Sequence, residues 1–301
     1  MPWAKRWWKI ALRTWDEIRA DDVFGRSAQL AYYFFLALFP FLICVIASLS
    51  VFGVADRGRA LLLDFLIRFL PLPAFQLVQT TVDEVIRASG PVKMSFGVIA
   101  SLWSASLGMG AVMDTLNAAY RVTETRSLWK QYAVAIGLTL GLGTMLVASI
   151  SAGLFVRRIA GVFPVSLPET IAVRLVLWPL VVAALLFGFA LTFYFAPNVE
   201  KRQWHWITPG AVAGILLLII ISRGLKAYLY YFPTYDATYG SLGAAIGLMM
   251  WLWLSAIVIL LGAELNSEIE HQTARDSTVG TEKPLGRRGA VMADTVGKAT
   301  T

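Results

Sequence analysis

The chain has 301 residues, of which 57% are hydrophobic and only 15% are charged. Soluble globular domains have roughly 45–50% apolar and about 25% charged residues, so this composition excludes an ordinary soluble enzyme. It equally excludes a disordered chain, which requires low hydrophobicity. The formal net charge of +7 is spread over basic residues that flank apolar stretches. That distribution is typical of a membrane protein and does not predict a nucleic-acid partner.

Residues 1–26 precede the first long apolar stretch and carry an amphipathic pattern. Trp8, Leu12, Trp15 and Ile18 recur at helical spacing, with lysine and arginine residues between them. The pattern predicts a cytoplasmic amphipathic helix that lies on the inner leaflet, with docking on the helical bundle as the alternative. The region lacks the apolar segment of a secretory signal peptide.

Six uncharged apolar stretches follow along the chain, of which the fifth, residues 207–222, is shorter and can span only if the turns after it are counted. A helix rises about 1.5 Å per residue, so roughly 18 or more residues can cross a hydrocarbon core of about 30 Å. We therefore predict an all-α integral membrane protein, with a six-helix transmembrane domain over residues 27–268. The expected spans are 28–54, 95–116, 131–156, 174–197, 207–229 and 239–264. Pro40 in the first span and Pro179 in the fourth are expected to kink their helices, because proline removes a backbone donor.

The loop over residues 57–93 is the longest connection between spans. Its first part, Leu61 to Leu70, is mostly apolar but too short to cross a membrane. Pro71 and Pro73 interrupt it, and apolar residues then return at helical spacing. We expect two short helices, joined at the prolines, that lie on the external side and cap the bundle.

Orientation follows from the placement of lysine and arginine. With a cytoplasmic N-terminus, the inner segments 1–26, 114–130, 197–206 and 264–301 hold 16 of the 26 basic residues. An even number of spans then places both termini in the cytoplasm. The polar residues 269–301 show no periodicity and are expected to form a disordered cytoplasmic tail.

Groups that could catalyse a reaction do not gather in the sequence. The two histidines, His205 and His271, stand apart from any carboxylate or thiol cluster with metal-ligand spacing. Cys44, the single cysteine, lies inside an apolar run and is interpreted as a packing residue. The chain has no Gly-rich phosphate loop with its lysine. We predict no enzymatic activity, no metal and no cofactor.

Polar residues at the cytoplasmic ends of the spans form one candidate site. Asp114, Asn117 and Arg121 are spaced to share a helix face, and Glu264 and Asn266 end the last span at the same depth. A salt bridge between Arg121 and Glu264 would hold these ends together. The cluster is interpreted as a cytoplasmic lock or, alternatively, as a gate that opens.

Basic residues at the external ends of the spans form a second candidate site. Arginine and lysine at headgroup level suit the phosphate of an anionic lipid, although they also suit simple snorkelling to the interface. The candidate headgroup residues are Arg157, Arg158, Arg174, Arg223 and Lys226.

Four stretches of the chain resemble the YihY/BrkB family of bacterial inner-membrane proteins. They are AYYFFLALFPFLI (31–43), SLWSASLGMGAVMDTLNAAY (101–120), WHWITPGAVAG (204–214) and YGSLGAAIGLMMWLWLSAIVILLGAELNSE (239–268). The resemblance implies a six-helix protein of the bacterial inner membrane. The family's earlier name, ribonuclease BN, is interpreted as a mislabel, and some relatives are associated with lipid export. The recurrent polar positions that it implies are Tyr32, Ser104, Ser106, Asp114, Asn117, Tyr120, Tyr239, Ser241, Glu264 and Asn266.

Two functions from different classes are carried forward. The first is a transporter or flippase-like protein for an anionic lipid or amphiphile of the cell envelope, with membrane lipids as partners. The second is a non-transporting scaffold or envelope-integrity protein that binds partner proteins. The sequence leaves the substrate, the energy coupling and the homo-oligomeric state open.

Overall fold

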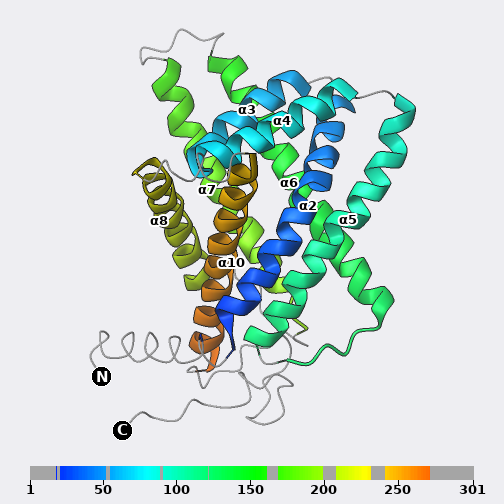
Figure 1. Cartoon of the computed structure of the whole chain (residues 1–301), viewed down its shortest axis with the longest axis vertical. Coiled ribbons are helices and arrows are strands. Elements are labelled where there is room, and N and C mark those ends of the chain that lie inside the picture. The colour runs from blue at the N-terminus through cyan, green and yellow to red at the C-terminus, as the bar shows by residue number, and fades with distance from the viewer. Residues whose placement is uncertain are drawn as a thin grey trace.

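The computed structural model describes residues 18, 21–51, 55–88, 91–120, 122–160, 169–198, 208–231 and 241–271. These residues form α-helices and no strand, which confirms the predicted all-α class (Figure 1). The helices are α2 (Val23–Val51), α3 (Ala55–Phe69), α4 (Leu72–Ala88), α5 (Pro91–Ala119), α6 (Leu128–Ala160), α7 (Glu169–Phe195), α8 (Pro209–Tyr231) and α10 (Ser241–His271).

Four of these helices are long and apolar enough to cross a membrane. The qualifying segments are Val23–Ser50, Leu128–Val156, Pro209–Tyr231 and Leu242–Ile269, in α2, α6, α8 and α10. They correspond to the first, third, fifth and sixth predicted spans. The helices α5 and α7 occupy the positions of the second and fourth, so a bundle of six spanning helices stays a prediction. Pro40 lies inside α2 and Pro179 inside α7, and both helices continue past the proline.

Several helix ends differ from the predicted boundaries. The boundaries were predicted from charged residues, which indicate where the chain reaches water, but a helix can continue beyond that point. The helix α2 begins at Val23, before the predicted residue 28, where Asp22 caps it. Asp22 has a left-handed φ of 47°, and its carboxylate accepts a long hydrogen bond from the Gly25 amide at 3.4 Å. The helix α10 continues to His271, so the predicted tail 269–301 begins inside a helix.

Parts of two predicted segments lie outside the described residues. In the predicted N-terminal helix over 1–26, the structure describes Ile18 and residues 21–26. Ile18 is buried against the bundle. The remainder of the predicted tail, residues 272–301, also lies outside them.

The two short helices expected between the first two spans are α3 and α4, which meet at Pro71. Figure 1 shows them lying across one end of the bundle, which we call the cap end. Their apolar faces pack on α2, α6 and α10 through a cluster that includes Leu61, Val78 and Val82. Arg59 of α3 donates a hydrogen bond to Asp83 of α4 and joins the two helices. This ion pair lowers the pKa of Asp83 and raises that of Arg59.

A second apolar cluster fills the opposite end of the bundle, which we call the loop end because residues 122–127 connect α5 to α6 there. Leu30, Leu116, Tyr120 and Leu260 are buried in it. The most extensive contacts between helices are those of α2 with α5, and of α10 with α8 and α2. The bundle is therefore packed at both ends, and the two clusters leave a space between α2, α5 and α6.

Candidate functional site

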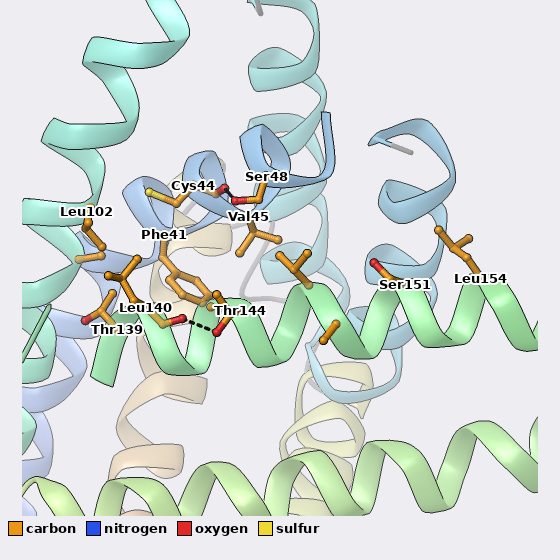
Figure 2. Close-up of a pocket in the computed structure, with 14 residues that line it drawn as sticks. Phe41, Cys44, Val45, Ser48, Leu102, Thr139, Leu140, Thr144, Ser151 and Leu154 are labelled. Carbon is orange, nitrogen blue, oxygen red and sulfur yellow. Dashed lines mark hydrogen bonds between the residues drawn. The ribbon is translucent and has the colours of Figure 1, made fainter. Parts of the chain in front are cut away.

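A cavity of about 670 Å³ lies between α2, α5 and α6. Figure 2 shows α6 along one side of it, with Phe41, Cys44 and Ser48 of α2 opposite. The lining residues Ser48, Leu140, Thr144 and Ala148 are exposed, so the cavity opens to the surface of the bundle. The full lining is Phe41, Cys44, Val45, Ser48, Leu102, Ala105, Thr139, Leu140, Gly143, Thr144, Val147, Ala148, Ser151 and Leu154. Phe41, the first lining residue along the chain, directly follows Pro40.

The cavity surface is apolar apart from its hydroxyl groups and one thiol, and its lining includes no charged residue. Ser48 donates to the carbonyl oxygen of Cys44, Thr139 to that of Ala135 and Thr144 to that of Leu140, each at 2.8 Å. These hydroxyls therefore use their hydrogens on their own helices, as serine and threonine commonly do. Such a surface suits a hydrocarbon chain and offers no counter-charge to an anion.

Lys226, one of the predicted headgroup residues, forms a hydrogen bond with another helix of the protein. Its Nζ donates a hydrogen bond at 2.6 Å to the carbonyl oxygen of Ile67, in the last turn of α3. Carbonyl groups in the last turn of a helix lack helical partners, so Lys226 caps α3 and ties it to α8. Arg223 lies one turn before Lys226 and is exposed.

The other predicted headgroup residues lie on α6 and α7. Arg158 is exposed in the last turn of α6, near Arg157, and Arg174 lies in α7; the side chains of Arg157 and Arg174 are outside the described part of the chain. Figure 1 shows α6 and α7 extending beyond α3 and α4 at the cap end, whereas α8 ends below them. The ends of α6 and of α8 therefore lie at different levels of the bundle.

Asn117, one of the predicted lock residues, lies in a hydrogen-bonded network at the loop end. Its Nδ2 donates to Glu124 Oε2 at 2.8 Å, and its Oδ1 accepts from the backbone N–H of Asn198 at 2.6 Å. Arg126 donates to both carboxylate oxygens of Glu124, at 2.8 and 2.6 Å, and to the carbonyl oxygen of Ala196 at 2.9 Å. The network therefore joins α5, the 122–127 loop and the end of α7.

Glu124 is the charged centre of this network. Burial alone would raise the pKa of its carboxyl, but the hydrogen bonds from Arg126 and Asn117 lower it overall. The side chains of Arg126 and Glu124 are only 9% and 18% exposed, so water weakens the pair less than at an open surface.

Asn266, a second lock residue, forms hydrogen bonds at the start of α8. Its Oδ1 accepts from the Gly210 amide at 2.8 Å, and its Nδ2 donates to Thr208 Oγ1 at 3.0 Å. Thr208 in turn accepts a hydrogen bond from the Ala211 amide at 3.1 Å and caps α8. Asn266 therefore fastens α10 to the start of α8, where Gly210 and Gly262 let the backbones approach closely.

The predicted lock residues differ in burial. Asp114 is exposed, whereas Asn117, three residues later, is buried. Glu264 is buried in α10 with 2% exposure, and the proposed Arg121 partner lies outside the described residues. In the described part of the chain, no three histidine, cysteine or acidic side chains are arranged to hold a metal ion.

Three residues of the network, Glu124, Arg126 and Asn198, and the cavity lining were not predicted from the sequence. The network residues come from a loop and two helix ends far apart in the chain, without a local pattern. A local signal did exist for Thr208: a threonine before Pro209 is typical of a helix start.

Comparison with known proteins shows a matching family and similar bacterial proteins. A model of the family described as Virulence factor BrkB matches residues 14–285. The ribonuclease-like protein YfkH of Bacillus subtilis (strain 168) is 35% identical over 250 residues, covering 81% of this chain and 88% of that protein. The UPF0761 membrane protein Smlt0865 of Stenotrophomonas maltophilia (strain K279a) is 29% identical over 261 residues, and the match spans 85% of this chain but only 59% of that relative. No solved structure matches.

Proposed function

The chain belongs to the Virulence factor BrkB family, and we propose that it is a flippase-like transporter of an anionic lipid or amphiphile of the cell envelope. The observation that carries the proposal is the cavity of about 670 Å³ between α2, α5 and α6. Its apolar lining provides a surface for a hydrocarbon chain, and its exposed lining residues provide an opening.

The position of the cavity supports transport better than simple lipid contact. It is lined by the middle of α2 and α6, two of the helices that are long and apolar enough to cross a membrane. A chain bound there would leave the lipid phase and pack between protein helices. The anionic character of the substrate is supported by the basic residues at the cap end of α6 and α7, which are Arg157, Arg158 and Arg174. We place this end on the external side.

The test compares two alanines of α6. Both residues are exposed, but Ala148 lines the cavity and Ala133 is not part of the lining. A tryptophan at position 148 would occupy cavity volume, and a tryptophan at 133 would enter the surrounding lipid. We expect the wild type and Ala133→Trp to accelerate translocation of fluorescent phosphatidylglycerol in proteoliposomes, and Ala148→Trp to give the rate of protein-free vesicles.

The contrary results separate the two functions. Equal rates for Ala148→Trp and wild type would show that the cavity does not carry the lipid. A wild-type rate equal to that of protein-free vesicles, with and without an imposed proton gradient, would contradict transport. The non-transporting scaffold would then be the better interpretation.

A further inference from the structure

We infer that Arg158 binds the phosphate headgroup of the amphiphile whose hydrocarbon chain occupies the cavity. The inference rests on the proposed function and adds the chemical class of the ligand and its direction in the site. The ligand is a phosphate-bearing amphiphile, held with its headgroup at the cap end of α6 and its chain toward the middle of the bundle.

The geometry of α6 carries this inference. Thr144, Val147, Ser151 and Leu154 line the cavity and follow one another at intervals of three and four residues. Positions at this spacing share one face of a helix. The next step along that face is Arg158, four residues past Leu154, and α6 is still helical there because it ends at Ala160. Arg158 therefore lies one turn beyond the end of the cavity lining.

The direction of the side chain follows from helix geometry. Side chains of an α-helix lean toward its N-terminus, so a residue covers the turn that precedes it. The N-terminus of α6 is at the loop end, and the turn that precedes Arg158 contains Leu154. An exposed arginine at this position extends back toward Leu154, where the cavity lining ends. There it can form paired hydrogen bonds with phosphate oxygens.

The cavity itself offers the headgroup no counter-charge. Its lining includes no cation, and the hydroxyl hydrogens of Ser48, Thr139 and Thr144 already bind backbone carbonyl oxygens. A phosphate group drawn inside would lose its hydration without gaining a counter-charge. The headgroup must therefore remain at an end of the cavity where a cation is available.

Lys226 does not serve this role as well as Arg158. Its Nζ is bound to the Ile67 carbonyl oxygen at 2.6 Å, and a headgroup would have to displace that contact. Its helix, α8, contributes no residue to the cavity lining. Arg158, in contrast, lies on a helix that lines the cavity, shares the lining face of that helix and is exposed.

The reactivity of Cys44 can measure whether the cavity is occupied. It is the single cysteine of the chain and lines the cavity, so its alkylation by N-ethylmaleimide reports whether the cavity is occupied. The distance along α6 from Thr144 to Arg158 is about 21 Å at 1.5 Å per residue, which calls for a long-chain probe. The full chain in phosphatidylcholine nanodiscs is titrated with hexadecyl phosphate, with uncharged hexadecanol, and with inorganic phosphate alone.

We expect hexadecyl phosphate to slow alkylation of Cys44 in the wild type. In Arg158→Gln, the concentration that gives half-protection should rise about tenfold, because a charge-assisted hydrogen-bonded pair is lost. Arg158→Lys should recover part of the loss, and protection by hexadecanol should be the same in all variants. Inorganic phosphate should not protect, since it has no chain. The matched control is Lys130→Gln, an exposed cation in the first turn of the same helix.

Two results would overturn the inference, and they are distinguishable. If hexadecyl phosphate protects wild type and Arg158→Gln at equal concentrations, Arg158 is not the headgroup site, although the cavity still binds the chain. If neither long-chain probe protects Cys44 in the wild type, the cavity does not bind such chains, and the proposed function fails together with this inference. Circular dichroism and a single species on size-exclusion chromatography confirm that each variant is folded.

Discussion

The crossing of α8 and α10 gives the sharpest prediction for stability. Gly210 is buried, and a Cβ placed on it would lie 2.6 Å from both Cγ and Oδ1 of Asn266 and closer still to the carbonyl oxygen of Gly262. Real Cβ atoms do not approach backbone atoms this closely, so Gly210→Ala must push the helices apart. The shift would also break the bond from the Gly210 amide to Asn266.

The expected cost follows from these two losses. Overpacking of a tight contact costs about 1–3 kcal/mol, and a lost buried hydrogen bond adds about 1 kcal/mol. Gly210→Ala should therefore lower the free energy of unfolding by about 2–4 kcal/mol. The measurement is equilibrium unfolding in mixed micelles with increasing SDS, followed by tryptophan fluorescence.

The matched control is Gly224→Ala in the same helix. Gly224 is exposed, and a Cβ on it would have no neighbour within 4 Å. Alanine is the better helix former, so this variant should be as stable as the wild type or more stable. Equal free energies of unfolding for the two variants would refute the close crossing of α8 and α10.

Two further predictions concern the ends of the bundle. The lowered pKa of Glu124 means that its stabilising effect is complete above the ordinary carboxyl pKa of about 4.3 and is lost as the pH falls through the lowered value. Glu124→Gln should cost about 1 kcal/mol at pH 7 and remove this acid-dependent loss from the unfolding free energy; an unchanged pH profile would contradict the network. At the cap end, Lys226→Met keeps an apolar stem but removes the donor to Ile67. Hydrogen–deuterium exchange should then increase in the last turn of α3 and stay constant in α4; equal exchange in α3 would rule out the tether.

The helices could be predicted from sequence because residues that face lipid and residues that face water differ strongly in polarity. Long uncharged stretches identified α2, α6, α8 and α10, and Pro71 separated α3 from α4. The ends were harder to predict, since a helix does not stop where its residues become polar. The helix α10 continues through Glu264 and Glu268, and both side chains are buried in the bundle.

The candidate site was less predictable, because its parts meet only through packing. Asn117 was recognised as a polar residue at a helix end, but its contact with Asn198 joins residues 81 positions apart. No local pattern announces such a pair. The cavity likewise depends on how α2, α5 and α6 diverge, and its lining of small and apolar residues is typical of any transmembrane helix.

The structure also changes which basic residues can test a headgroup role. Arg223 and Lys226 are the obvious pair from spacing alone, since they share a helix face near the membrane surface. Yet replacing Lys226 would remove the cap on α3 at the same time, so a loss of transport could follow from a displaced cap. Arg158 avoids this ambiguity because it is exposed and continues the cavity-lining face of α6. Substitution of Arg158 therefore tests the headgroup contact while the tether between α3 and α8 stays in place.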